Sequence, residues 1–267
     1  MPILSNGELS VDYLDDGAGP AVVLIHSSVS GNKQWKRLIE ALRPDYRCFA
    51  PNLRGYGLTP SWQAGRRQTL ADAAEITLAL CEKIQGPIRI VGHSWGGAVA
   101  LATASKLGHT VSHMVLYEPM LTGLLHGHGR AEAWSEAMSI YAAVQELGDA
   151  QDWVALAEVF TDYFNGEGSW AATPVERQRL IAAQLPPNRH EWDAGVQSRT
   201  ARDFDGATAQ TLILRGSLTR LVTKETAAVL HEAFPHWELR DILGAGHMGP
   251  LTHGPIVNAE IQSFLAS

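Results

Sequence analysis

One serine in this chain stands in a setting that would make it a nucleophile. Ser94 lies in the motif GHSWGG, between an apolar strand-like run and a helix-forming segment. A serine at such a strand–turn–helix junction is held in a strained backbone conformation that lifts its hydroxyl clear of the sheet. Gly92, Gly96 and Gly97 leave room where a Cβ would collide across the turn. The N-terminus of the next helix favours negative charge beside Ser94. We therefore predict that Ser94 is a catalytic nucleophile.

A serine hydroxyl is a weak nucleophile until a base takes its proton, and histidine suits that task because its pKa lies near neutrality. Of the 11 histidines, His247 has the most suitable context, in the glycine-rich stretch GAGHM (244–248) after the last strand-like run. Such a loop can bend back over the edge of a sheet. This context favours His247 as the general base.

The other histidines fit different roles. His253 lies toward the final helix and is expected at the surface, and His93 is expected to pack beneath Ser94. His126 and His128, in LLHGHGR, lack nearby cysteines or acids and are a poor ligand set for a metal. We predict a solvated loop there and no metal site.

Short β-rich runs alternate with helical patterns on both sides of these residues. The predicted strands are 21–26, 46–52, 87–94, 111–119, 211–216 and 236–243, and the predicted helices are 32–44, 69–84, 95–108, 224–234 and 255–267. Apolar runs without polar alternation, separated by helices, indicate strands covered on both faces. The pattern is typical of a parallel sheet in an α/β fold.

Residues 120–203 interrupt this alternation. They contain helical segments such as AEAWSEAMSIYAAVQEL and WVALAEVFTDYF, with no convincing strand. A helical insertion between two strands is expected to lie over the carboxyl edge of the sheet, where open α/β sheets bind ligands. We therefore predict a core made of residues 1–119 and 204–267, and a helical cap made of residues 120–203.

The overall composition restricts the partners. The net charge is −7 and no basic run is present, which argues against nucleic acid or an anionic membrane surface. No apolar stretch reaches the ~20 residues of a membrane helix, and MPILSNGELS has no signal-peptide pattern. Cys48 and Cys81 are expected to be buried thiols. We expect a cytoplasmic monomer or homodimer that acts on a small-molecule substrate.

The GHSWGG motif and four further stretches resemble the α/β-hydrolase fold superfamily over nearly the whole chain. These stretches are AVVLIHSSVSGNKQW (21–35), PNLRGYGLT (51–59, with Asn52 where an Asp is usual), LILRG with LVT (212–223), and ILGAGHMGPLTHGPIVNAEIQSFL (242–265). The resemblance implies an α/β-hydrolase fold: a mostly parallel twisted sheet flanked by helices, with a helical cap insertion. It also implies a hydrolase that needs no cofactor, with His247 as its catalytic histidine.

The acid that should orient His247 is missing from its usual place. The family usually has an Asp in the turn after the strand 211–216, and this chain has the uncharged Thr219 there. Some members, the haloalkane dehalogenases among them, carry the acid after an earlier strand, which in this chain ends at Glu118. A carboxylate at the mouth of a buried strand is costly unless it is paired, and a histidinium would offset that cost. The order Ser94, Glu118, His247 also follows the fold's usual sequence of roles.

Three other interpretations of the acid stay open at this stage. Glu118 could satisfy only backbone donors near Pro119 at the entry to the cap. Asp241, in the strand-like run HWELRDIL, is a reserve candidate. A Ser–His dyad in which Thr219 merely orients the ring would be slow, since loss of the acid typically lowers turnover by about 10⁴.

Acyl transfer also needs donors for an oxyanion. The N–H of Trp95 follows the nucleophile at a helix start, and the N–H of Ser28 is the best second donor by position. The family usually shows His-Gly in this loop, whereas this chain has His26-Ser27-Ser28. The hydroxyl of Ser27 or Ser28 is therefore a candidate for the pocket, unless both serines only cap the turn.

Aromatic side chains are frequent in the cap segment: Trp134, Tyr141, Trp153, Phe160, Tyr163, Phe164 and Trp170. Many are expected to pack helices together. A subset is expected to line an apolar pocket over Ser94, and the candidates are Trp134, Phe164 and Trp170, together with Ser27 and Met248. Such a lining suits a partly hydrophobic acyl or aryl group.

These residues predict a serine hydrolase that cleaves a carboxylic ester or related acyl compound through an acyl-enzyme. Carbon–carbon bond hydrolysis and perhydrolysis use the same triad and stay open. A ligand-binding or degenerate member of the fold is the rival from another class, suggested by Thr219 and by the Ser27-Ser28 loop.

Overall fold

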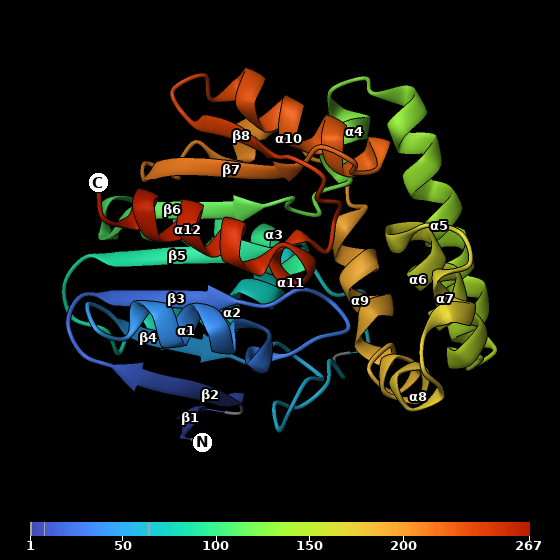
Figure 1. Ribbon diagram of the computed structural model, residues 1–267, viewed down its shortest axis with the longest axis horizontal. Coiled ribbons are helices and arrows are strands. Elements are labelled where there is room, and N and C mark those ends of the chain that lie inside the picture. The colour runs from blue at the N-terminus through green and yellow to red at the C-terminus, as the bar shows by residue number, and fades with distance from the viewer. Residues whose placement is uncertain (1, 8, 64) are drawn as a thin grey trace.

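The centre of the molecule is a mostly parallel β-sheet (Figure 1). The computed structural model describes residues 2–7, 9–63 and 65–267. The described strands are β1 (Ile3–Asn6), β2 (Leu9–Gly17), β3 (Ala21–Ile25), β4 (Arg47–Pro51), β5 (Ile88–His93), β6 (Val111–Tyr117), β7 (Gln210–Gly216) and β8 (Glu238–Ile242). Their order in the sheet is β1-β2-β4-β3-β5-β6-β7-β8. Strands β3 to β8 run parallel, and β2 is antiparallel to β1 and β4.

Helices connect or follow the parallel strands, because a parallel pair needs a crossover. They are α1 (Lys36–Leu42), preceded by the 3-10 turn η1 (Asn32–Trp35), then α2 (Leu70–Cys81), α3 (Trp95–Leu107) with η2 (Gly108–Thr110), α10 (Leu221–Ala233), α11 (Gly249–Thr252) and α12 (Gly254–Leu265). Thr69 caps α2 through a capping box with Asp72, which confirms the predicted start of this helix.

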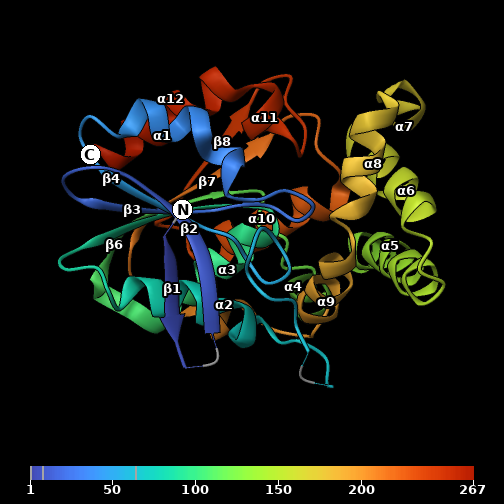
Figure 2. The ribbon, with the colours of Figure 1, turned by 90° about the horizontal axis from the view of Figure 1, so that it is seen from below.

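These helices form two layers around the sheet. Figure 2 shows α1 and α12 on one face, and α2 and α3 on the other. Each layer has its own apolar core: Leu38 and Ile261 belong to one, and Ile76 and Leu101 to the other. Strand β3 lies between the layers and is buried at every residue, as expected for a run without polar alternation.

The antiparallel pair β1 and β2 was not among the predicted strands. Strand β2 joins the sheet through β4 and is exposed along its second half. A half-exposed edge strand that carries Asp and Gly lacks the continuous apolar run on which the sequence-based assignment relied. The pair extends the sheet away from Ser94.

Helices alone fill the fully described segment between β6 and β7. They are α4 (Gly123–Gly127), α5 (Ala131–Asp149), α6 (Trp153–Asn165), α7 (Ser169–Ala172), α8 (Val175–Ala183) and α9 (Pro186–Gly195), followed by the 3-10 turn η3 (Ala201–Phe204). Figure 1 shows α5 to α9 beyond the carboxyl ends of the parallel strands. They share a separate apolar core that includes Val144, Leu156 and Trp192. On this basis we propose that residues 120–203 form the cap and that 1–119 and 204–267 form the core.

Candidate active site

Ser94 occupies a sharp turn between β5 and α3. Its backbone has φ 55° and ψ −121°, in the left-handed half of φ space, where a residue with a side chain is strained. A Cβ on Gly92 would lie 2.4 Å from the carbonyl oxygen of Gly96, and a Cβ on Gly96 would lie 2.3 Å from that of His26. The two glycines therefore allow the turn that projects Ser94 over the carboxyl edge of the sheet.

His247 lies in the loop between β8 and α11, and its ring faces Ser94. Its Nε2 is 2.9 Å from Oγ of Ser94, and both residues are buried. Its Nδ1 is 2.7 Å from Oε2 of Glu118. Because the carboxylate accepts from Nδ1–H, Nε2 is left with a lone pair to accept the proton of Ser94. This is the tautomer that a general base requires.

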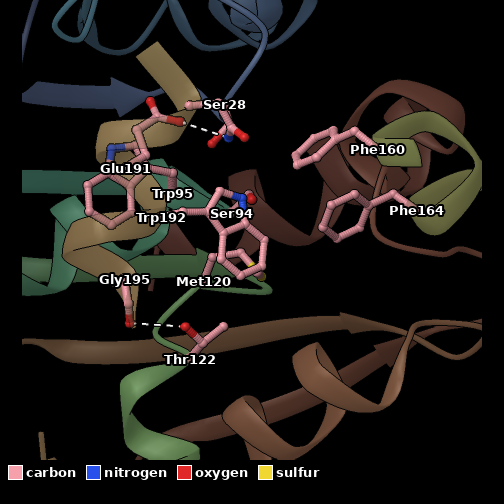
Figure 3. Close-up of a pocket in the computed structure, with 11 residues that line it drawn as sticks. Ser28, Ser94, Trp95, Met120, Thr122, Phe160, Phe164, Glu191, Trp192 and Gly195 are labelled. Carbon is pink, nitrogen blue, oxygen red and sulfur yellow. Dashed lines mark hydrogen bonds between the residues drawn. The ribbon is translucent and has the colours of Figure 1, made fainter. Parts of the chain in front are cut away.

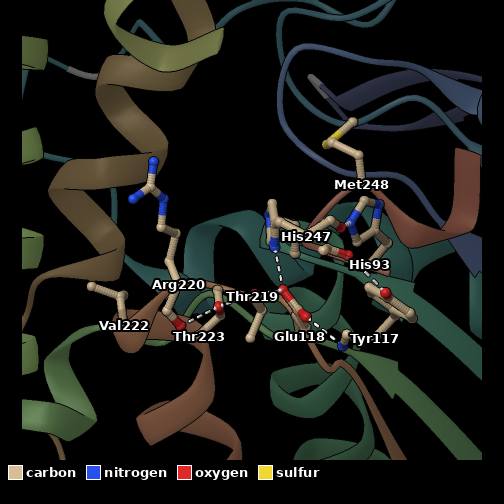
Figure 4. Close-up of polar contacts among 12 residues, drawn as sticks. His93, Tyr117, Glu118, Thr219, Arg220, Val222, Thr223, His247 and Met248 are labelled. Carbon is tan, nitrogen blue, oxygen red and sulfur yellow. Dashed lines mark hydrogen bonds and ion pairs between the residues drawn. The ribbon is translucent and has the colours of Figure 1, made fainter. Parts of the chain in front are cut away.

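Glu118 follows the last residue of β6, and its side chain is fully buried (Figure 4). Oε1 accepts a hydrogen bond from the N–H of Gly216 at 2.7 Å. Oε2 accepts from His247 and from the hydroxyl of Thr219, each at 2.7 Å. The backbone of Glu118 has φ 43°, a strained conformation of the kind that clusters at functional sites. Three donors thus offset the burial of this carboxylate.

Thr219 is close to the carboxylate even though it carries no charge itself. It lies three residues after the end of β7 and donates to Glu118, and its Oγ1 lies 2.6 Å from Oγ1 of Thr223 on α10. Figure 4 shows these hydroxyls beside Glu118, at the carboxylate oxygen that His247 also contacts. The residue at the family's usual acid position therefore donates a hydrogen bond to a carboxylate that follows the neighbouring strand β6.

Asp241, the reserve candidate, is engaged elsewhere. Its two carboxylate oxygens accept from Nε and Nη2 of Arg215 at 2.7 and 3.0 Å. This exposed pair lowers the pKa of Asp241, chiefly through the Arg215 hydrogen bonds. Among the described residues, His247 pairs with Glu118, and Asp241 pairs with Arg215 instead.

A second polar chain, absent from the sequence analysis, joins the loop after β3 to the loop that carries His247. Oε1 of Gln34 accepts from the N–H and the hydroxyl of Ser27, at 3.1 and 2.8 Å. Nε2 of Gln34 lies 3.1 Å from Nδ1 of His93, and Nε2 of His93 lies 2.9 Å from the carbonyl oxygen of His247. His93 must donate to that carbonyl, so its Nδ1 accepts from Gln34.

His93 stays neutral in this chain of contacts, because burial lowers its pKa well below the ordinary value and the neighbouring His247 adds to the effect. In sequence, Gln34 is an ordinary polar residue of a predicted helix, and nothing there indicates its contacts with Ser27 and His93. The contacts depend on residues 59 and 154 positions apart.

The start of α3 and the loop after β3 both lie at Ser94. The N–H of Trp95 is at the first position of α3, where a helix has no internal acceptor for it. The N–H of Ser27 is used by Gln34, and Ser28 follows it at the wall of the cavity beside Ser94. His26 fixes this loop: its Nε2 accepts from the N–H of Leu53 at 3.0 Å and its Nδ1 donates to the carbonyl oxygen of Ser27 at 2.7 Å. Burial lowers the pKa of His26 to about 4.

Two cavities meet at Ser94. The smaller, of about 20 Å³, extends toward Trp95, Glu191 and Trp192 (Figure 3). The larger, of about 200 Å³, is lined by Ser27, Ser28, Val29, Phe160, Thr161, Phe164, Asn165, Thr173, Arg177, Ile181, His247 and Met248 besides Ser94. Phe160 and Phe164 border both cavities. The two spaces lie between the core loops and helices α6, α8 and α9 of the cap.

Only some of the predicted pocket residues line the cavities at Ser94. Phe164 stacks on the ring of His247, with centroids 4.4 Å apart, and lines both cavities. Ser27 and Met248 line the larger one. Trp134 instead packs edge-on against His126, and Trp170 is buried in the core of the cap. Neither lines the two cavities at Ser94, because the helical period turns them toward other helices.

Glu191 is a buried acid at the site that the sequence analysis did not single out. It lies on α9, is 5% exposed and lines the smaller cavity. Burial raises its pKa to about 7, against the weaker effect of the Ser28, Asn188 and Tyr56 side chains. In sequence, Glu191 is one of two acids in the stretch 186–195, with Asp193, and nothing there signals its burial before the cap is folded.

His126 and His128 contact groups of the segment 198–201. His128 accepts from the N–H of Ala201 at 3.0 Å, and Nδ1 of His126 lies 3.3 Å from Oγ of Ser198. Within residues 2–7, 9–63 and 65–267 there is no cluster of three or more His, Cys, Asp or Glu side chains suited to a metal ion. In the same ranges no helix has the length and apolar character to cross a membrane, and Cys48 and Cys81 are buried free thiols.

The sheet, the strained serine turn and the helical insertion together define an α/β-hydrolase fold. The profile of the Alpha/beta hydrolase family matches residues 22–259, and the chain belongs to this family. The predicted fold class is thereby confirmed.

The chain is similar to several hydrolases along nearly its whole length. It is 26% identical to 2-hydroxy-6-oxo-2,4-heptadienoate hydrolase of Pseudomonas putida over 275 residues, which cover 98% of this chain and 94% of the relative. It is 30% identical to the lipase LipV of Mycobacterium tuberculosis over 269 residues, which cover 93% and 94%. The crystal structure of the enol-lactonase from Burkholderia xenovorans shares the fold, with a TM-score of 0.80, 15% identity and full coverage of both chains. This protein is accordingly an α/β-fold hydrolase.

Proposed function

We propose that this protein is a serine hydrolase that cleaves a carboxylic ester or a related acyl compound through an acyl-enzyme. The observation that carries the proposal is the unbroken line of hydrogen bonds from Ser94 through His247 to Glu118, at 2.9 and 2.7 Å. Serine activation needs this set of groups in this order. The similarity to the lipase LipV, 30% identical along 93% of this chain, supports ester chemistry.

In the first half of the reaction, Oγ of Ser94 attacks the ester carbonyl carbon while Nε2 of His247 takes the hydroxyl proton. The carbonyl electron pair moves to the oxygen, and the tetrahedral adduct forms. Glu118 stabilises the resulting imidazolium without taking its proton. The imidazolium then gives the proton to the leaving alcohol as the carbon–oxygen bond breaks.

In the second half, water attacks the acyl-enzyme. His247 takes a proton from the water and returns it to Oγ of Ser94 when the acid departs. In both halves, the N–H groups of Trp95 and Ser28 are the proposed donors to the oxyanion. Their support is positional, because Trp95 starts α3 and Ser28 lines the cavity at Ser94.

A ligand-binding or degenerate member of the fold is the rival proposal. Thr219 first suggested it, but Thr219 donates to Glu118, so the change of residue leaves a carboxylate beside His247. A buried, strained serine that bonds a histidine has no evident use in a passive binding site. We therefore favour catalysis.

Carbon–carbon bond hydrolysis is the second candidate reaction. It is favoured by the similarity to 2-hydroxy-6-oxo-2,4-heptadienoate hydrolase, 26% identical along 98% of this chain. It would use the same three residues, with a carbon leaving group in place of the alcohol. Perhydrolysis, in which peroxide replaces water in the second half, is a further variant of the same mechanism.

The decisive experiment combines a fluorophosphonate probe with an ester panel of increasing acyl length. We expect the parent chain to label at Ser94 and to hydrolyse part of the panel, while Ser94→Ala does neither. A vinylogous 1,5-diketone tested in parallel reports carbon–carbon cleavage. A parent chain that neither labels at Ser94 nor turns over any ester or diketone would overturn the proposal of catalysis.

A further inference from the structure

The smaller cavity at Ser94 has two hydrogen-bond acceptors that the mechanism above does not use. Oε2 of Glu191 accepts from Nδ2 of Asn188 at 3.2 Å. Oε1 of Glu191 and Oδ1 of Asn188 are buried and accept no well-formed hydrogen bond from the described residues. The Ser28 and Tyr56 hydroxyls lie near enough to the Glu191 carboxyl to act weakly on its pKa, against the larger effect of burial. Both side chains line the cavity, and they are 5% and 1% exposed. Figure 3 shows Glu191 on the Ser28 side of the cavity, away from Phe160 and Phe164.

A buried acceptor without a donor is unfavourable for folding. The raised pKa of Glu191, about 7, reflects the same cost, with burial as its main cause. Side chains that break the burial rules without any gain in stability are typical of sites that bind a ligand. A donor supplied by a ligand would satisfy the two oxygens.

The size of the cavity limits that ligand group. Its volume of about 20 Å³ suffices for one water-sized group. Trp95, Met120 and Trp192 supply apolar walls, and among the described lining residues Glu191 is the one with an ionisable side chain. A single hydroxyl or ammonium group fits this combination of size, apolar wall and acceptor.

The position of the cavity also indicates which part of the substrate would carry this hydroxyl or ammonium group. Ser94 and Ser28 line it together with Glu191, so its occupant lies within a few bonds of the carbon that Ser94 attacks, on either side of the ester. The larger cavity, of about 200 Å³, begins at the same serine and has room for the rest of the molecule.

We propose that Glu191 and Asn188 form a polar subsite that binds a hydroxyl or ammonium group next to the scissile carbonyl. The preferred substrates are then esters with a small donor-bearing substituent, either an α-hydroxy or α-amino acyl group or a 2-hydroxyethyl or 2-aminoethyl alcohol. This inference rests on the proposed function, because it names the substrate class of that same site.

The test compares matched ester pairs that differ in one donor. Glycolate and glycinate esters are compared with propionate esters of the same alcohol, and 2-hydroxyethyl and 2-aminoethyl esters with propyl esters of the same acid. We expect kcat/KM of the parent to favour a donor-bearing member by about tenfold or more. The pair that shows the preference identifies the group and the side of the ester that enters the subsite.

Three variants isolate the cause of the preference. Glu191→Leu removes both carboxylate oxygens and is expected to abolish the preference, and Glu191→Gln to reduce it. Glu158→Gln removes an exposed carboxylate from the cap helix α6 and serves as the matched control, with the preference retained. The melting temperature of each variant checks that it is folded.

A second measurement does not depend on turnover. Glycolamide and propionamide are compared as ligands of Ser94→Ala by saturation-transfer NMR, with and without Glu191→Leu. Stronger binding of glycolamide that is lost with Glu191 supports the subsite, even if no ester is cleaved. Equal ratios in the parent and in Glu191→Leu, with esters hydrolysed and Ser94 labelled, would overturn the subsite and leave the proposed function intact.

Discussion

Thr219 and His247 bond to the same oxygen atom of Glu118, each across 2.7 Å. A neutral hydroxyl and an imidazole thus share one carboxylate. This carboxylate follows β6, whereas the family's usual acid follows the strand that is β7 in this chain. The hydroxyl holds Oε2, and the N–H of Gly216 holds Oε1 at 2.7 Å. The carboxylate is fixed from both sides, which favours one orientation of the histidine ring.

The first prediction concerns the acid. Glu118→Gln is expected to lower kcat by about 10³ to 10⁴, because an amide does not stabilise the imidazolium. Asp241→Asn is the matched control, and it should change kcat by less than about twofold because its exposed pair with Arg215 lies away from the ring. Steady-state ester hydrolysis measures both. Equal rates for Glu118→Gln and the parent would remove Glu118 from the mechanism.

The second prediction moves the carboxylate. Thr219→Asp in the parent places two carboxylates in one buried site and is expected to lower activity through their repulsion. The same change in Glu118→Gln supplies an acid at the family's usual position and is expected to recover about tenfold or more of the lost kcat. Thr219→Asn in Glu118→Gln is the uncharged control. If the Asp and Asn double variants had the same rate, a negative charge at position 219 would not be able to replace that of Glu118.

The third prediction concerns the polar chain behind the histidine. Gln34→Met leaves Ser27 and His93 without their amide partner, so the free energy of unfolding should fall by about 1–3 kcal/mol. Because Gln34 acts through these neighbours, kcat should fall about tenfold or more with KM little changed. Gln34→Glu, which retains an acceptor for Ser27 but not the donor to His93, is expected to lie in between. A loss of stability at unchanged kcat would assign Gln34 a purely structural role.

The fourth prediction separates two cap aromatics that the sequence could not distinguish. Phe164→Ala uncovers the ring of His247 and is expected to lower kcat/KM about tenfold, since the stacked ring excludes water from the base. Trp134→Ala removes a ring that packs on His126 instead, and kcat/KM should stay within about twofold of the parent. The ester on which the parent is most active provides the assay. Similar losses in both variants would point to general weakening of the cap.

The fifth prediction is the pH dependence that Glu191 gives to stability. Its pKa rises from 4.5 to about 7 on folding, so between these values the folded state binds a proton that the unfolded state has lost. The stability contribution is present below about pH 4.5 and is lost as the pH rises through about 7.

Glu191→Gln removes this dependence. Its free energy of unfolding relative to the parent should therefore increase from pH 5 to pH 8, by about 3 kcal/mol at most, at about 1.4 kcal/mol per pKa unit. Urea unfolding at several pH values measures the difference, and Glu158→Gln is the control. A constant difference between the parent and Glu191→Gln over this range would show that Glu191 is ionised throughout.

Local sequence patterns determined the parallel strands, the helices between them and the turn at Ser94. The apolar runs that became β3 to β8 and the helices between them are visible because parallel strands are buried on both faces and each crossover needs a helix. The GHSWGG motif identified the turn of Ser94, since its glycines are steric requirements of a few adjacent residues. His247 was recognised from its glycine loop and from the resemblance to the family.

Tertiary structure alone decided which side chains meet across the sheet edge. Glu118, Asp241 and Thr219 were all open candidates in sequence, and only the register of β6, β7 and β8 places Glu118 beside His247 and pairs Asp241 with Arg215. The same holds for Gln34 and Glu191, whose partners lie on other elements. The sequence predicts only on which helix or strand such a side chain lies. Their burial and partners depend on the long-range packing that closes the cap over the core.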